Sequence, residues 1–224
     1  PVVPMPDIHL TQARAPLTQS VTAIDEQGIA QSISIPAERA LTLYVDKREL
    51  VTLMTLGARP EWLVLGYLRN QRLVDSVADI DSITVDWDVQ AAAVATRAGI
   101  ERFDEKTAKR VVTTGCGQGT VFGDLMDEID RLSLPAGATL TRAALYDLLD
   151  RVRLHETIYK QSGAVHGCGL ATNAGDASEI LMFVEDVGRH NAVDAIAGRM
   201  WLDRIDGADK IFYTTGRLTS EMVI

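Results

Sequence analysis

Apolar positions are densest between residues 180 and 200. Residues 180–184 form a continuous apolar run, typical of a strand buried on both faces, and residues 185–191 form a polar turn. From Asn191, a candidate N-cap, apolar side chains recur at helical spacing. A second strand at residues 210–214 is followed by Thr215-Gly216-Arg217. The pattern predicts a βαβ unit whose polar turns lie at the carboxyl ends of parallel strands, where open α/β sheets place their ligand sites.

The first half of the chain alternates as strands do. Residues 40–45 and 50–54 flank a polar turn and predict an antiparallel hairpin. A helix is expected to open at residues 57–60, and further strands at 83–87 and 89–94. We therefore expect a strand-rich N-terminal subdomain over residues 17–107. Residues 1–16, rich in proline and without periodicity, are expected to be a disordered arm.

The second half predicts an α/β domain over residues 108–224. Apolar spacing predicts one helix over 121–132, and a longer one that Thr141 caps and that runs through Tyr159 to Gly163. Residues 163–171 are apolar and rich in glycine. A helix begins again at Thr219 and stops at Ile224 without a C-cap, so the domain is expected to be incomplete at its C-terminus. The fold class is α/β, or α+β when both parts are counted.

Composition narrows the function classes. The chain has 224 residues, 46% hydrophobic and 24% charged, with a formal net charge of −9. A negative chain repels the phosphate backbone, so broad nucleic-acid binding is not expected. No apolar run approaches the ~20 residues of a membrane helix, and no signal-peptide layout is present. We expect a cytoplasmic protein with no membrane association. Its two cysteines are too few for a disulfide framework.

Cys116 is the first candidate for chemistry. Glycines at 115, 117 and 119 surround it, and a predicted helix begins just after the loop. The positive end of that helix favours the thiolate, which is the nucleophilic form of cysteine. The alternative, a small buried cysteine in a glycine-rich turn, is the commoner case for an arbitrary cysteine. The absence of large neighbours favours a functional thiol here.

Cys168 and the two loop histidines have simpler interpretations. Cys168 lies among apolar residues with glycine on both sides, so a core thiol is favoured over a second, sulfur-relaying one. His166 and His190, each taken alone, are interpreted as structural hydrogen-bonding residues. His190 gains functional weight because charges of both signs crowd its turn.

Arg189 is a candidate phosphate ligand. Asn191 and the backbone amides at the start of the following helix could assist it. A salt-bridged turn that locks the helix to the sheet explains the same residues equally well. Zinc is disfavoured because the chain has no close C-x-x-C pair and no H-x-E. We expect no resident metal.

One run of ten residues is far more specific than these single positions. The sequence Glu185-Asp-Val-Gly-Arg-His-Asn-Ala-Val-Asp194 resembles the signature of the formate dehydrogenase accessory sulfurtransferase family, FdhD/NarQ. Residues 162–166, residues 215–222 and the Cys116 loop support the resemblance, as does the N-terminal sequence around Met54 and residues 65–66. Together these segments extend from the first predicted hairpin to the end of the chain.

The resemblance implies a sulfurtransferase that takes persulfide sulfur from a cysteine desulfurase. The sulfur would pass through Cys116 to the molybdenum cofactor, in its bis-molybdopterin guanine dinucleotide form, for the catalytic subunit of formate dehydrogenase. The resemblance also implies a cytidine-deaminase-like three-layer domain and a homodimer. A guanine nucleotide is expected to mimic the cofactor. The implied cofactor-binding residues are Asp186, Arg189, His190, Asn191, Thr214, Gly216, Arg217 and His166.

Two departures from the family pattern stand out. The family usually carries C-x-x-C, whereas Gly119 occupies the place of the second cysteine here. A single persulfide carrier needs only the first thiol. The family also usually continues some tens of residues beyond Ile224, through a segment implicated in cofactor binding.

Two other functions remain open. A non-catalytic chaperone for the molybdenum cofactor or the nascent dehydrogenase would keep its activity without Cys116. A nucleotide-binding regulatory module would depend on Arg189 instead. Deamination is disfavoured because the sequence His166-Gly-Cys168 lacks the glutamate of H-x-E.

Overall fold

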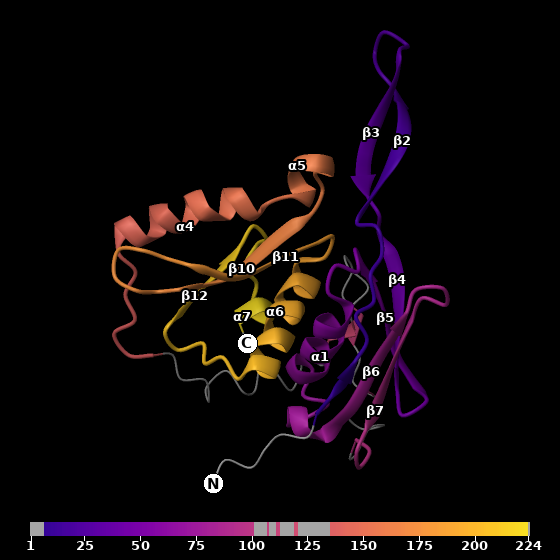
Figure 1. Ribbon diagram of the computed structural model, residues 1–224, viewed down its shortest axis with the longest axis vertical. Coiled ribbons are helices and arrows are strands. Elements are labelled where there is room, and N and C mark those ends of the chain that lie inside the picture. Colours follow the sequence, from indigo (N-terminus) through magenta and orange to yellow (C-terminus); the bar gives the residue numbers. More distant parts are fainter. Residues whose placement is uncertain (1–6, 101–106, 108–110, 113–118, 121–134, 224) are drawn as a thin grey trace.

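A computed structural model places two β-sheets on either side of a pair of helices (Figure 1). It describes residues 7–100, 107, 111–112, 119–120 and 135–223. The Cys116 loop and the whole of the helix predicted over 121–132 lie outside the described residues. The short strands β8 (Val111–Val112) and β9 (Gly119–Thr120) pair with each other in antiparallel fashion. No described helix is both long and apolar enough to cross a membrane.

The N-terminal sheet has five strands in the order β1-β6-β7-β4-β5. The predicted hairpin is confirmed as β4 (Arg39–Val45) and β5 (Arg48–Thr55), with a two-residue turn at Asp46 and Lys47. Both turn residues have positive φ, 48° and 70°, which matches the twist of a tight hairpin. The two later strands are confirmed as β6 (Ile80–Asp86) and β7 (Ala91–Thr96). The second begins later than predicted, because Val89 lies in the turn and is 69% exposed.

The prediction of a disordered arm is wrong for residues 7–16. Strand β1 (His9–Leu10) pairs in parallel with β6. Two further bonds anchor the segment, because the Thr11 hydroxyl and the Ala13 amide both donate to the Glu61 carboxylate at 2.8 Å. These long-range contacts outweigh the weak local propensity of a proline-rich segment. Next in the chain, β2 (Thr18–Ile24) and β3 (Ala30–Pro36) form a two-stranded ribbon that projects from the body (Figure 1).

The C-terminal sheet has the order β11-β10-β12. Its strands are β10 (His166–Thr172), β11 (Ile180–Asp186) and β12 (Lys210–Thr214). The predicted parallel direction of β11 and β12 is confirmed, because each is antiparallel to β10. They are not neighbours, however, since β10 lies between them. The expectation that β11 is buried on both faces is wrong at its start: β11 is an edge strand, and Leu181 is 40% exposed.

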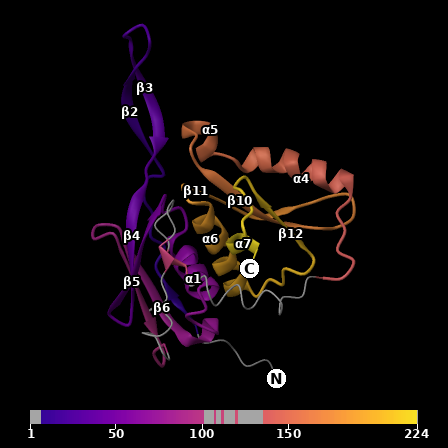
Figure 2. The ribbon, with the colours of Figure 1, turned by 180° about the vertical axis from the view of Figure 1, so that it is seen from behind.

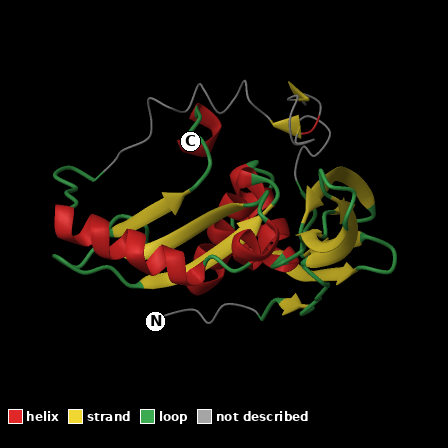
Figure 3. Cartoon of the chain, turned by 90° about the horizontal axis from the view of Figure 1, so that it is seen from above, coloured by secondary structure: helices red, strands yellow, loops and turns green. Residues whose placement is uncertain are grey.

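Helices cover both faces of this sheet, as Figures 2 and 3 show. On one face, Cys168 and Leu170 belong to the core that includes α6 (Arg189–Asp203). On the other, Phe183 packs with α4 (Arg142–His155). Thr141 caps α4 as predicted, by accepting a hydrogen bond from Ala144 N at 3.1 Å. The result is an α/β/α arrangement, and the mixed α/β class is confirmed.

The single long helix predicted from Thr141 to Gly163 is wrong. It ends at His155, and a separate helix α5 (Ile158–Ser162) follows. The break occurs because the Glu185 carboxylate accepts hydrogen bonds from the backbone amides of Thr157, Ile158 and Tyr159, at 2.9–3.0 Å. A carboxylate that binds three amides at the start of a helix fixes a new helix N-terminus at that point.

The two halves meet where α1 (Pro60–Asn70) crosses α6. The predicted helix opening near residues 57–60 is thereby confirmed. Gly66 of α1 and Gly198 of α6 allow the backbones to touch: a Cβ on Gly66 would lie 1.7 Å from the carbonyl oxygen of Asp194, and one on Gly198 would lie 2.0 Å from that of Trp62. One continuous core therefore joins both sheets through this helix pair. The short η1 (Val77–Asp79) and α7 (Ser220–Val223) complete the described elements.

Candidate functional site

The two polar turns singled out in the sequence meet at one edge of the C-terminal sheet. His166 at the start of β10 pairs with Asp186 at the end of β11, and Cys168 pairs with Thr214 at the end of β12. The carboxyl ends of β11 and β12 therefore flank the amino end of β10. In Figure 2, β11 leads into α6 and β12 leads on toward α7 from this end of the sheet. The arrangement brings together residues 166, 186–191 and 214–217.

Asp186 holds the first turn against the N-terminal sheet. It is 3% exposed, and its carboxylate accepts four hydrogen bonds. One oxygen binds the Thr55 hydroxyl at 2.5 Å and the Leu56 amide at 3.3 Å, while the other binds the Gly188 amide and the Asn191 side chain, both at 3.0 Å. Burial raises the pKa of this carboxyl, and the four hydrogen bonds oppose that rise. Asp186 therefore fixes the turn to the end of β5.

Asn191 has a structural position as well. It is 4% exposed, and its amide donates to Asp186 and to the Met54 carbonyl, at 3.0 and 2.7 Å. The prediction that Asn191 caps the helix is wrong: α6 begins at Arg189, and Gly188 occupies the N-cap position. The helix starts earlier because Asp186 already binds the Gly188 amide, which turns the chain before residue 189.

Three basic side chains, His166, Arg189 and Arg217, come from the segments that meet at this edge of the sheet. The pKa of His166 is lowered, first by partial burial and then by the positive charges of Arg189 and Arg217. The segments that carry these side chains are held together by geometry, because Arg189 packs against Gly216 and the Gly167 amide donates to Thr215 Oγ1. Arg189 Nε is buried and has no hydrogen-bond partner among the described residues. A buried donor without a partner is costly, so this atom is available to a ligand acceptor.

Gly216 makes room for Arg189. A Cβ at position 216 would lie 2.8 Å from Arg189 Cδ and 2.9 Å from its Cβ. The glycine therefore lets the arginine side chain lie directly on the 214–217 turn. The Thr214 hydroxyl accepts a hydrogen bond from the Gly216 amide at 3.0 Å, which holds that turn in place. An anion at this edge would meet a neutral imidazole and two guanidinium groups.

Cys168 is enclosed beneath the cluster. It is fully buried, its Sγ lies 3.2 Å from the Thr214 hydroxyl, and burial raises the pKa of the thiol from 9.0 to about 11. Such a thiol remains protonated and is a poor nucleophile. The geometry agrees with a core thiol. His190, on the first turn of α6, is half-buried and has interaction partners of its own.

Sequence reasoning missed several residues that build this site. Thr55 reaches Asp186 across 131 positions of sequence, and no local pattern could indicate that contact. Thr215 Oγ1 accepts the Gly167 amide at 3.0 Å and joins β10 to the second turn. Cys116 lies outside the described residues, so its predicted role stays a prediction. Within the described part of the chain, no three His, Cys, Asp or Glu side chains come together as a metal site.

The fold and this edge define an α/β protein with an arginine and histidine cluster suited to an anionic ligand. The sequence model of the FdhD/NarQ family matches residues 36–224, and the chain belongs to that family.

Relatives named as sulfur carriers are similar over most of the chain. The sulfur carrier protein FdhD of Listeria innocua is 30% identical over 204 residues, which are 89% of this chain and 76% of that one. The protein of the same name from Wolinella succinogenes is 25% identical over 84% of this chain and 64% of its own length. A crystal structure of a proposed formate dehydrogenase accessory protein from Desulfotalea psychrophila superposes with a TM-score of 0.70. It is 26% identical, and the match covers 93% of this chain and 78% of that one.

Proposed function

We propose that this protein is a sulfur carrier that takes persulfide sulfur from a cysteine desulfurase. It would deliver the sulfur to the molybdenum cofactor, in its bis-molybdopterin guanine dinucleotide form, for the catalytic subunit of formate dehydrogenase. Membership of the FdhD/NarQ family carries the sulfur-transfer part of the proposal. The anion-binding part rests on the unpartnered Arg189 Nε beside His166 and Arg217.

The chemical step falls to Cys116. Its thiolate attacks the outer sulfur of the donor's persulfide; a new sulfur–sulfur bond forms on Cys116 and the donor's own sulfur–sulfur bond breaks. The donor cysteine leaves as a thiolate, so this exchange needs no external oxidant or reductant. Delivery of the carried sulfur to molybdenum as sulfide takes two electrons, which a thiol co-reactant would supply. One cysteine suffices for this cycle, in keeping with glycine at position 119.

The molybdenum cofactor is the substrate, and its nucleotide phosphates fit the described cluster. Arg189 and Arg217 would bind phosphate oxygens through charge-assisted hydrogen bonds, and Gly216 lets the Arg189 side chain lie against the turn that leads to Arg217. His166 and Thr214 border the same turn. Asp186 and Asn191 would act by positioning it, because both are buried and bonded to protein groups. His190 would help to orient the first turn of α6.

Three further expectations belong to the proposal. The domain over residues 108–224 would be cytidine-deaminase-like, the protein would act as a homodimer, and it would contact the dehydrogenase before cofactor insertion. A homodimer would double the number of anion clusters available to a cofactor that carries two guanine nucleotides. Analytical ultracentrifugation with and without guanosine diphosphate tests the assembly.

Intact mass spectrometry tests the carrier step. The protein is incubated with cysteine and a cysteine desulfurase, and wild type is compared with Cys116→Ala and with the matched control Cys168→Ala. A gain of one sulfur atom, reversed by a reductant and absent only from Cys116→Ala, is the expected result. If wild type gains no sulfur while the desulfurase is active, the carrier proposal fails.

A non-catalytic cofactor chaperone is the second candidate. The observation that favours it is that the described basic groups lie at a site whose described cysteine, Cys168, is fully buried, so these groups can bind a cofactor without a reactive thiol. Activation of apo-formate dehydrogenase separates the two functions. A chaperone would keep its activity as Cys116→Ala, whereas a carrier would lose it. Titration of wild type and of Arg189→Gln with guanosine diphosphate then measures nucleotide binding alone. The carrier and the chaperone both require this binding, and a nucleotide-binding module would depend on it entirely.

A further inference from the structure

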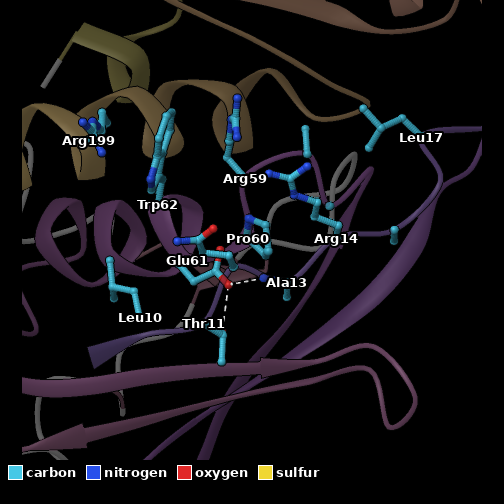
Figure 4. A pocket seen from close by; sticks show the side chains of 14 residues that line it. Leu10, Thr11, Ala13, Arg14, Leu17, Arg59, Pro60, Glu61, Trp62 and Arg199 are labelled. Atoms are coloured by element: carbon cyan, nitrogen blue, oxygen red, sulfur yellow. Dashed lines mark hydrogen bonds between the residues drawn. The ribbon is translucent and has the colours of Figure 1, made fainter. Parts of the chain in front are cut away.

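A separate pocket lies where the N-terminal segment crosses the start of α1. Its volume is about 530 Å³, a size usual for small-molecule sites. It shares no lining residue with the cluster of His166, Arg189 and Arg217. The wall is formed by residues 10–15, Leu17 and residues 57–62, together with Arg199 of α6. Figure 4 shows the side chains that line it.

Three arginines and one tryptophan give this pocket its chemistry. The guanidinium carbon of Arg59 lies 4.8 Å from the centroid of the Trp62 ring, and that of Arg199 lies 5.0 Å from it. In Figure 4 the three side chains form a row along the α1 and α6 wall, and Arg14 extends toward Arg59 from the N-terminal segment. A guanidinium group that stacks by its face keeps the N–H groups at its edge free for oxygen acceptors.

The charges around the pocket leave a positive excess. Arg14 and Arg59 are exposed, and neither guanidinium group has a hydrogen-bonding or ion-pairing partner among the described residues. Arg199 is paired with Asp203 at 2.6 Å. The only carboxylate that lines the described pocket, Glu61, is occupied by two donors from the N-terminal segment. Such a local excess of positive charge is unexpected in a chain with a net charge of −9. Guanidinium groups that point into the same space repel each other unless an anion lies between them.

We propose that this pocket binds the phosphate groups of a small molecule. Arg14 and Arg59 both line the pocket, and neither guanidinium group has a hydrogen-bonding or ion-pairing partner in the described part of the chain, so both can bind the oxygens of a phosphate or diphosphate. The stacking of Arg59 on Trp62 reduces the entropy lost when that side chain binds. Free pyrophosphate and a nucleoside diphosphate share this chemistry. The site is independent of the sulfur-transfer proposal, because it uses neither Cys116 nor the edge of the C-terminal sheet.

Calorimetric titration of the full chain with pyrophosphate tests the site. Saturable binding is expected, and Arg59→Gln or Arg14→Gln should weaken it by about tenfold or more, as for loss of one charge-assisted hydrogen bond. Arg59→Lys keeps the charge and should still weaken binding, because it loses the stacked fork. The matched control is Arg142→Gln, which removes an exposed arginine at the start of α4. It should leave binding unchanged.

Two more arms locate the ligand and identify its source. Binding should change the tryptophan fluorescence of wild type, and Trp62→Phe, which leaves two of the three tryptophans, should remove that change. Tighter binding of a nucleoside diphosphate than of pyrophosphate would support a phosphate ester as the occupant, and equal binding would support the free anion.

Three results would overturn the proposal. The first is no saturable binding of either probe, and the second is an equal loss of affinity in Arg142→Gln. The third is loss in Arg217→Gln with Arg59→Gln unaffected, which would assign the binding to the other cluster.

Discussion

The crossing of α1 and α6 is the most consequential contact in the fold, because it joins the two sheets and supports the turn that carries Arg189. Gly198→Ala tests this contact. Its new Cβ would lie 2.0 Å from the Trp62 carbonyl oxygen and 2.7 Å from the Gly66 amide nitrogen, whereas ordinary contacts begin near 3.4 Å. Both neighbours are backbone atoms, which cannot rotate away. The helices must therefore part by more than an ångström.

Two opposing terms set the magnitude. Alanine in place of glycine in a helix interior stabilises by about 1 kcal/mol. Overpacking a close contact costs typically about 1–3 kcal/mol and occasionally more, and a backbone clash belongs at the upper end. Parting the helices also loosens Ala195 and Ile196, which are 2% and 1% exposed. We expect a net loss of about 2 kcal/mol or more, which lowers Tm by roughly 4–8 °C in a chain of this size.

Guanidinium chloride unfolding, followed by tryptophan fluorescence, measures this loss. Gly207→Ala is the matched control, because the nearest atom to its Cβ would be the flexible end of Met200 at 3.4 Å. It should change the free energy of unfolding by less than about 0.5 kcal/mol. If Gly198→Ala is instead more stable than wild type by about the helix-propensity difference, the two helix backbones are not in contact at this position.

The remaining predictions concern buried titratable groups. Burial raises the pKa of Asp194 to about 7, against the hydrogen bond from Asn70, so its protonated form is favoured in the folded state. The stability that protonated Asp194 contributes is complete below pH 3.8 and is lost as pH rises toward 7. The free energy of unfolding in urea should therefore fall between pH 3.8 and 7 in wild type, and this fall should be smaller in Asp194→Asn. The pKa of Cys168 is raised to about 11, so the free energy of unfolding should also fall as pH rises from 9 to 11. In the variant Cys116→Ala, a disulfide reagent at pH 8 should label Cys168 only when the protein unfolds. Rapid labelling of the folded protein would contradict a buried Cys168 thiol. In Asp186→Asn, a side-chain NH2 group would face groups that donate hydrogen bonds to the native carboxylate, so the free energy of unfolding should fall by about 2 kcal/mol in the same assay. The control Asp150→Asn changes an exposed carboxylate and should have little effect.

Local patterns were sufficient for the elements with regular periodicity. The hairpin of β4 and β5, the pair β6 and β7, and the cap at Thr141 all follow from neighbouring residues. Strand β10 was not predicted, because its sequence contains two glycines in its first four residues. Packing explains those glycines. A Cβ at Gly167 would lie 2.6 Å from the Phe183 ring, so the central strand β10 needs residues without a side chain where the aromatic ring of β11 lies against it.

The meeting of the two polar turns was predictable, because both follow strands of the same direction. Their contacts with distant elements were not. Thr55 reaches Asp186 from the far end of β5, and Glu185 fixes the start of α5 rather than facing a ligand. The pocket at Trp62 depends on three separate segments, so no single stretch of sequence indicates it.

The acidic members of the motif at residues 185–194 are all occupied by protein groups. Glu185 binds the amides of α5, Asp186 binds the end of β5, and Asp194 accepts from Asn70. Arg189 differs, because its Nε is buried without a partner in the described part of the chain. A motif that served only to lock the helix to the sheet would pair its arginine with its own carboxylates. Substitution of the acidic residues should therefore lower the free energy of unfolding. Arg189→Gln should leave the free energy of unfolding nearly unchanged and should reduce the affinity for an anion. The ligand-binding role then belongs to the basic side of the turn.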